Sequence, residues 1–190
     1  MAPEDPPADS WRLRNAARRL REGAILAYPT EGVYGLGCDP LNRAAVERIL
    51  VLKQRPAASG LILVAADFFQ LEPFVRALGT ARMREIEASW PGPHTWLLPA
   101  AHGVPPWLRG EHTTLAVRVT AHPLAAALCR AFGGPLVSTS ANRSGRAPAL
   151  CPLQVRLRCP GVDLVIHGPL GGRPGPSVIQ DGATGRLIRA

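Results

Sequence analysis

The sequence lacks the features that mark membrane, metal-binding and redox proteins. It has no apolar run long enough to cross a bilayer and no signal-peptide pattern, so we expect a cytoplasmic protein with no membrane partner. Its four cysteines form no C-x-x-C pair, and its five histidines show no metal-ligand spacing. We therefore predict no metal site and reduced thiols. A Walker loop and a Ser-His-Asp order are also absent from the sequence.

Lysine is almost missing from a strongly basic chain. Of the 22 basic residues, Lys53 alone is lysine and the other 21 are arginine; with 14 acidic residues the net charge is +8. This charge favours anionic partners such as nucleotides or RNA. An ammonium is a compact point charge and a guanidinium is a planar fork. One retained lysine therefore points to a task that arginine performs poorly.

The residues that are present indicate a globular protein. The chain has 190 residues, of which 46% are hydrophobic and 19% charged, which is enough for one core. Residues 1–9 are rich in proline, aspartate and glutamate. We predict that residues 1–9 are a disordered N-terminus and that residues 10–190 form one domain.

Helical patterns alternate with short apolar runs. Helices are expected at 11–22, 43–53 and 123–132, with weaker patterns at about 70–78 and 80–89. Strands are expected at 24–28, 61–65, 94–99, 114–120, 136–139 and 164–167, followed by a hairpin of 177–180 and 186–189. Because several strands are joined by short links, we predict an α/β fold: one twisted mixed sheet with helices on its faces.

A segment rich in glycines and hydroxyls follows the first expected strand. Gly35 and Gly37 begin a G-x-G pattern, but Pro40 leaves it incomplete, so a Rossmann site is disfavoured. These glycines serve either a turn or the close approach of a ligand. Thr30 and Glu31 suit the charged ends of an amino acid, although from spacing alone a local turn or helix cap is the preferred interpretation.

Three further features suggest a site for an anionic ligand. Lys53 and Arg55 can converge on phosphates if the helix ends near Lys53; the alternative is two solvated charges at a helix C-terminus. The run 138–142, Ser-Thr-Ser-Ala-Asn, lies at the carboxyl end of a strand, where ligands bind in open α/β sheets. Arg118 interrupts an apolar strand, so it needs an anionic partner from the protein or from a ligand.

These segments together resemble the YrdC family in its short bacterial form. The resemblance runs in order from about residue 11 to the end of the chain, and it implies a twisted α/β sheet with a basic cavity. The matching segments are Tyr28-Pro29-Thr30-Glu31-Gly32-Val33-Tyr34-Gly35-Leu36-Gly37, Lys53-Gln54-Arg55-Pro56, Trp90-Pro91-Gly92-Pro93-His94-Thr95, Leu115-Ala116-Val117-Arg118-Val119 and Ser138-Thr139-Ser140-Ala141-Asn142-Arg143-Ser144-Gly145.

The resemblance implies that L-threonine, bicarbonate and ATP are converted to L-threonylcarbamoyladenylate and pyrophosphate. The product would serve the threonylcarbamoyl modification of adenosine 37 in tRNA, with partner proteins of the TsaD, TsaB and TsaE types. A carbamate oxygen would attack the α-phosphorus of ATP. Because that oxygen is already anionic, no strong general base is needed, which fits the absence of a nucleophile–histidine arrangement.

The resemblance also implies roles for particular residues. Lys53 and Arg55 would act as catalytic residues at the phosphates, Ser140 and Asn142 would hold nucleotide, and Thr30, Thr95 and Arg118 would hold threonine. Mg²⁺ would accompany the phosphates, although no carboxylate cluster dedicated to it is visible. Val64 and Ser59 stand where longer family members often have histidine and asparagine, so those contacts are not carried over.

Two other functions compete with this one. A non-catalytic RNA-binding module fits the net charge of +8 and predicts salt-sensitive RNA binding without ATP turnover. It does not explain the hydroxyl-rich run at 138–142, and no K/R-G-F-type RNA motif is present. The related domain that makes carbamoyl-adenylate in hydrogenase maturation occurs in long proteins with cysteine-rich segments, which this chain lacks.

Overall fold

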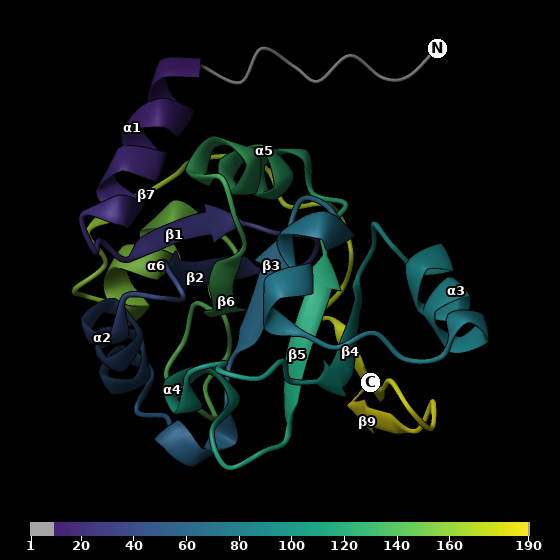
Figure 1. Ribbon diagram of the computed structural model, residues 1–190. Helices are drawn as coiled ribbons and strands as arrows, with labels where there is room; N and C mark the ends of the chain where they lie inside the picture. The colour runs from purple at the N-terminus through teal and green to yellow at the C-terminus, as the bar shows by residue number, and fades with distance from the viewer. Residues whose placement is uncertain (1–9, 190) are drawn as a thin grey trace, which may run out of the picture.

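A mixed, twisted sheet runs through the molecule in this computed structural model, which describes residues 10–189 (Figure 1). Within these residues the sheet has nine strands in the order β7-β1-β2-β6-β3-β5-β4-β8-β9. The predicted disordered segment 1–9 lies outside the described residues. The strands are β1 (Leu26–Pro29), β2 (Tyr34–Cys38), β3 (Ile62–Ala65), β4 (His94–Pro99), β5 (Thr114–Val119), β6 (Leu136–Ser140), β7 (Leu164–Val165), β8 (Val178–Asp181) and β9 (Leu187–Arg189).

Helices lie on both faces of this sheet, as predicted. They are α1 (Ser10–Arg21), α2 (Arg43–Lys53), α3 (Thr80–Ala88), α4 (Pro106–Arg109), α5 (Pro123–Phe132) and α6 (Pro152–Arg158). The bounds predicted for α2, α5 and β4 are confirmed. The helix predicted at 70–78 is wrong: this stretch holds parts of two 3₁₀ turns, Phe68–Gln70 and Glu72–Phe74. Pro73 lacks the N–H that a continuous α-helix needs, which explains the break.

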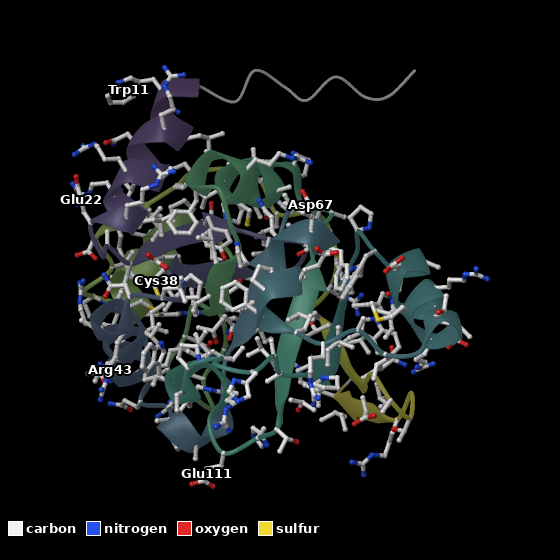
Figure 2. The ribbon with its side chains drawn as sticks, viewed as in Figure 1. Trp11, Glu22, Cys38, Arg43, Asp67 and Glu111 are labelled. Carbon is white, nitrogen blue, oxygen red and sulfur yellow. The ribbon has the colours of Figure 1, made fainter. Side chains whose placement is uncertain are left out.

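Alternating residues of the central strands divide the core between the two faces. Leu63 of β3 packs in the cluster with α2, α3 and α4, whereas its neighbour Val64 packs with α1 and α5. Cys38 lies in the interior, whereas Glu22 and Arg43 lie at the periphery (Figure 2). All four cysteines are free. Because Val64 packs against α1 and α5, it is a core residue of that side of the sheet.

The glycine-rich segment forms a strand that the sequence pattern did not reveal. No strand was predicted between 24–28 and 61–65, but residues 34–38 are β2, paired with β1 on one side and β6 on the other. A Cβ atom on Gly37 would lie 2.7 Å from both the Val137 carbonyl oxygen and the Tyr28 ring. Gly37 is therefore required by the close packing of neighbouring strands, and neither a turn nor a ligand explains it.

Candidate active site

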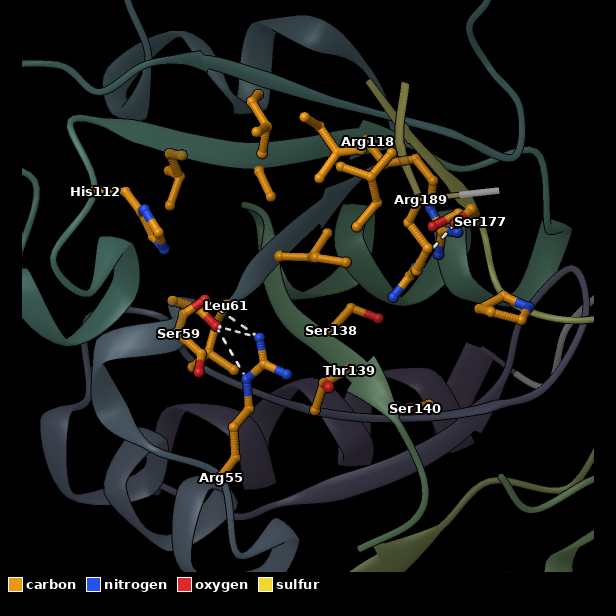
Figure 3. Close-up of a pocket in the computed structure, with 18 of the residues that line it drawn as sticks. Arg55, Ser59, Leu61, His112, Arg118, Ser138, Thr139, Ser140, Ser177 and Arg189 are labelled. Atoms are coloured by element: carbon orange, nitrogen blue, oxygen red, sulfur yellow. Dashed lines mark hydrogen bonds between the residues drawn. The ribbon is translucent and has the colours of Figure 1, made fainter. Parts of the chain in front are cut away.

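The register of the sheet assembles the floor of a cavity from four strands. Ser138 of β6 pairs with Ile62 of β3, which pairs with Ala116 of β5, which in turn pairs with Leu97 of β4. All four residues line a cavity of about 460 Å³ (Figure 3). Because side chains alternate along a strand, Ser140 and Arg118 lie on the same face as this row, two residues along their strands.

The lining of this cavity is strongly cationic. It contains one lysine and four arginines and, among the described residues, no aspartate or glutamate. Low-dielectric walls with charges of one sign concentrate an electric field that attracts anions. The basic residues are Lys53, Arg55, Arg109, Arg118 and Arg189. Hydroxyl groups lie between them, on Ser59, Thr114, Ser138, Thr139, Ser140, Ser144 and Ser177.

The end of α2 places Lys53 and Arg55 in the lining of the same cavity. The helix ends at Lys53, and Gln54 adopts a left-handed conformation with φ of 51°, which turns the chain away from the helix axis. Arg55 then donates from Nε to the Gly60 carbonyl at 3.2 Å and from Nη2 to the Ser59 carbonyl at 3.2 Å. These bonds fix the guanidinium against the wall of the cavity that Ser59 and Gly60 form (Figure 3).

Lys53 is buried beneath the polar run that follows β6. It is only 2% exposed, and its Nζ donates to the carbonyls of Ser140 (2.6 Å) and Asn142 (3.0 Å) and to Asn142 Oδ1 (3.1 Å). These three bonds use all three ammonium protons. Burial, and then the charge of Arg55, lower the pKa of Lys53 to about 8. The single lysine therefore positions the Ser140–Asn142 segment.

The side chain of Asn142 holds the same segment together by hydrogen bonds to Lys53, Ser140 and Arg146. Its Oδ1 accepts from Lys53 and from the Ser140 hydroxyl (2.6 Å), and its Nδ2 donates to the Arg146 carbonyl. We expected Ser140 and Asn142 to lie on a loop after the strand, with side chains that contact nucleotide. Instead Ser140 ends β6, and the Asn142 amide is bonded within the protein, although both residues line the cavity.

Replacing Asn142 with alanine should therefore affect stability and ligand binding together. The change removes the acceptor of two hydrogen bonds and the donor of a third, and it leaves buried polar partners unsatisfied. We expect a loss of ~1–3 kcal/mol in the free energy of unfolding and weaker ATP binding, measured by denaturant titration and calorimetry. Asn142→Asp, which keeps an acceptor oxygen for Lys53 and Ser140 but loses the donor to Arg146, should retain more stability than Asn142→Ala. Equal stability of wild type and Asn142→Ala would contradict the role assigned to this amide.

Arg118 has the anionic partner that its place in an apolar strand required. Its Nη2 lies 3.5 Å from Oε2 of Glu31, and both side chains are buried. The other Glu31 oxygen accepts from the Thr120 hydroxyl (2.7 Å) and the Ala121 N–H (3.1 Å). Burial alone would raise the pKa of Glu31, but Arg118, Thr120 and the backbone N–H groups lower it below its ordinary value. Arg118 Nε has no hydrogen-bond partner within residues 10–189.

Replacing Glu31 with glutamine should destabilise the fold, because Arg118 would keep a buried charge without its counter-charge. We expect a loss of ~3 kcal/mol and a melting temperature lower by about 6–12 °C. Because the folded-state pKa of Glu31 is lowered, the stabilisation is complete above its ordinary value of 4.5 and disappears as the pH falls through the folded-state pKa. The difference between wild type and Glu31→Gln should therefore shrink below about pH 4.5. A constant difference down to pH 2 would rule out this explanation.

Two of the predicted threonine-binding residues lie behind the cavity surface. The Thr30 hydroxyl donates to the Val33 carbonyl at 2.7 Å, which is the local turn preferred from its spacing. The Thr95 hydroxyl lies 2.9 Å from the hydroxyl of Ser177, and Ser177 faces the cavity. Thr30 and Thr95 are not among the described residues that line the cavity, whereas Arg118 is.

The sequence patterns missed residues at both ends of the cavity. Arg109 ends α4 and His112 follows it, whereas Ser177 directly precedes β8 and Arg189 ends β9. Arg189 donates to the Ser177 carbonyl at 2.9 Å, which ties the last strand to the cavity wall (Figure 3). The sequence offered no signal for these residues beyond an excess of arginine. Ser177 and Arg189 reach the cavity only because β8 pairs with β4.

The described residues contain no group of three or more His, Cys, Asp or Glu side chains able to hold a metal ion. They also contain no helix that is long and apolar enough to span a membrane.

Comparisons with known proteins identify the family. A family model named Sua5_yciO_yrdC, with the description "Telomere recombination", matches residues 18–190. The threonylcarbamoyl-AMP synthase of Nitrosococcus oceani is 58% identical over 181 residues, covering 95% of this chain and 98% of that protein. The threonylcarbamoyl-AMP synthase of Methylococcus capsulatus is 53% identical over 180 residues, covering 94% of this chain and 97% of that protein.

Solved structures agree with this assignment. Sua5 of P. abyssi complexed with L-threonine matches with a TM-score of 0.85 and 35% identity, over 90% of this chain and 51% of that one. YciO of E. coli matches with a TM-score of 0.83 and 30% identity, over 95% of this chain and 89% of that one. With a family model over most of its length and near-complete relatives above half identity, this chain belongs to the Sua5/YciO/YrdC family, as its motifs predicted.

Proposed function

We propose that this protein is a threonylcarbamoyl-AMP synthase, which makes L-threonylcarbamoyladenylate and pyrophosphate from L-threonine, bicarbonate and ATP. The observation that carries this proposal is a cavity lined by one lysine and four arginines, without a carboxylate among its described lining residues. Such a cavity suits a triphosphate and an anionic carbamate together. Relatives bearing that name match nearly the whole chain, and a Sua5 structure of the family is complexed with L-threonine.

The chemistry requires positioning and charge stabilisation. Bicarbonate and the threonine amine combine to give a carbamate and water. A carbamate oxygen then forms a bond to the α-phosphorus of ATP, and the bond to the bridging oxygen breaks as pyrophosphate leaves with its electrons. The nucleophile is already anionic, so no side chain has to remove a proton from it at this step. The cavity cations would stabilise the charge that spreads over the phosphate oxygens.

The contacts of the cavity suggest a division of roles. Arg55, held by the Ser59 and Gly60 carbonyls, would bind phosphate directly, and Lys53 would act beside it by fixing the segment that contains Ser140 and Asn142. Arg118, which lines the cavity, would donate hydrogen bonds to the carboxylate of threonine. Thr30 and Thr95 would support this end of the site from behind.

The remaining participants follow from the reaction. Mg²⁺ would arrive with the phosphates, because the described residues offer no carboxylate cluster of their own for it. The product would be used by proteins of the TsaD, TsaB and TsaE types to modify adenosine 37 of tRNA. The basic surface fits contact with tRNA, and we place the reaction in the cytoplasm. Residues 10–190 would form one domain of this family.

The test is pyrophosphate release from ATP, measured with threonine and bicarbonate each omitted in turn. We expect release only when ATP, threonine and bicarbonate are all present, and a product that carries both the threonyl and the adenylyl groups by mass spectrometry. Salt-sensitive RNA binding without any pyrophosphate release would instead support the RNA-binding module.

A further inference from the structure

A patch of leucines on the outside of the molecule has no role in the proposed reaction. Leu153 and Leu157 lie one turn apart on α6 and are 64% and 73% exposed. Leu150, just before the helix, is 54% exposed, and its N–H donates to the Gln154 side chain in the first turn (2.8 Å). Val155 anchors the other side of α6 in the core. We call Leu150, Leu153 and Leu157 the leucine patch; contiguous exposed apolar residues mark interaction sites.

The charges around the leucine patch have one sign. The sequence contains no acidic residue between Glu111 and Asp163. Arg143, Arg146 and Arg156, which flank the patch along the chain, are all exposed. A second copy of this protein docked face to face would bring these arginines against each other, which costs free energy. The charges therefore favour a different protein, one with acidic side chains around an apolar hollow.

Acidic residues on the neighbouring surface do not change this conclusion. Glu47 of α2 lies near Gly161, just after α6, but its carboxylate binds Arg43 at 2.7 Å. Asp163 binds Arg48 at 3.0 Å. These carboxylates already have arginine partners of their own, so the arginines beside the leucine patch keep their excess of positive charge.

The leucine patch is tied to the cavity by short connections. Arg158, in the last turn of α6, donates to the carbonyls of Ala147 and Pro148 at 3.0 and 2.7 Å. These two residues belong to segment 141–149, which is closed by a bond from the Ala149 N–H to the Ala141 carbonyl (2.9 Å) and which includes Asn142 at the cavity. A protein bound to α6 would therefore lie beside the segment that lines the adenylate site.

The chemistry of the product indicates which protein this is. On the proposed function, on which this inference rests, the product is a mixed carbamic–phosphoric anhydride, and water destroys such anhydrides. The enzyme that consumes it must let an amine of tRNA attack the carbamoyl carbon while AMP leaves with the electrons of the C–O bond. Release beside that enzyme would shorten the time that the anhydride spends in water.

We propose that the leucine patch is the docking surface for the enzyme that transfers the threonylcarbamoyl group from the adenylate. Three leucines and an arginine rim make a small interface, below the ~1,200 Å² typical of stable complexes. The association is therefore transient, and the basic rim steers it, so it weakens as salt is added.

The experiment compares Leu157→Glu with Phe69→Glu. Phe69 is 79% exposed and lies in a 3₁₀ turn away from α6, so it matches Leu157 in exposure and in the change made. The full chain is mixed with the purified transfer enzyme, tRNA and substrates at limiting synthase. Binding of the two proteins is followed by sedimentation velocity. We expect Leu157→Glu to lower the tRNA modification rate and the affinity about tenfold or more, while Phe69→Glu matches wild type.

Pyrophosphate release without the transfer enzyme distinguishes a failure of the proposed synthase function from a failure of the docking surface. Leu157→Glu should release pyrophosphate and melt like wild type; if wild type itself releases none, the proposed function and this inference both fall. Unchanged coupled modification in Leu157→Glu would overturn the docking surface alone. The patch would serve another partner if Leu157→Glu left coupled modification intact but abolished self-association, binding to phosphatidylglycerol vesicles or binding to tRNA alone. Any of these results would also overturn the docking surface for the transfer enzyme.

Discussion

Lys53→Arg is expected to lower the turnover of adenylate synthesis about 100-fold, or ~3 kcal/mol in activation free energy. The Nζ of Lys53 is buried and surrounded by three acceptors at 2.6, 3.0 and 3.1 Å. A planar guanidinium is larger and cannot direct three bonds from one atom, so it should displace the segment that carries Ser140 and Asn142. The measurement is steady-state pyrophosphate release, with the melting temperature recorded in parallel. The loss of turnover should exceed any loss of stability.

Arg84→Lys is the matched control, because Arg84 is exposed and the exchange is reversed. It should leave turnover unchanged. The pH profile gives a second readout, because burial and Arg55 lower the pKa of Lys53 to about 8. In wild type, kcat/KM for ATP should fall as the pH rises through about 8, where the free enzyme loses this ammonium. The residual activity of Lys53→Arg should lack this fall. Wild-type turnover in Lys53→Arg would refute the assignment.

Valine should be rejected as a substrate by about 10⁴-fold in kcat/KM relative to threonine. The two amino acids have the same shape, but valine lacks the hydroxyl, so a site that hydrogen-bonds this group would leave a buried partner unsatisfied. Serine lacks only the methyl group, which contributes ~1 kcal/mol or somewhat more. Serine should therefore be a poor but detectable substrate. The measurement is adenylate formation with each amino acid at equal concentration.

The structure changes which residue we expect to read this hydroxyl. The family resemblance implied that Thr30 holds threonine, but the Thr30 hydroxyl donates to the Val33 carbonyl and Thr30 is not among the described lining residues. Ser138 and Ser177 line the cavity with Arg118 and are better placed (Figure 3). Ser177→Ala should reduce the preference for threonine over valine, with Ser59→Ala, at the opposite wall, as the control. Equal use of valine and threonine by wild type would remove the threonine assignment altogether.

Most of the regular elements and the motif residues could be predicted from the sequence, because their signals are local. The Asn42 cap and the apolar spacing of α2 define that helix, and the short apolar run Trp96–Leu98 indicates β4. The solitary Lys53 and the charge of Arg118 in an apolar strand also indicated sites that need buried partners. In each case the information lies within a few neighbouring residues, where backbone geometry and burial follow directly from residue type.

Only the tertiary structure decided which residues meet. Strand β2 was hidden because Gly37 is required by close packing against Val137 of β6, a residue far away in the sequence. The sequence left open whether the anionic partner of Arg118 is a ligand or a protein side chain. The structure shows that Glu31, in the β1–β2 turn, forms an ion pair with it. Arg189 reaches the cavity because β8 pairs with β4 and carries the C-terminal hairpin there. Strand register and long-range packing set these contacts, and no periodicity within a single segment encodes them.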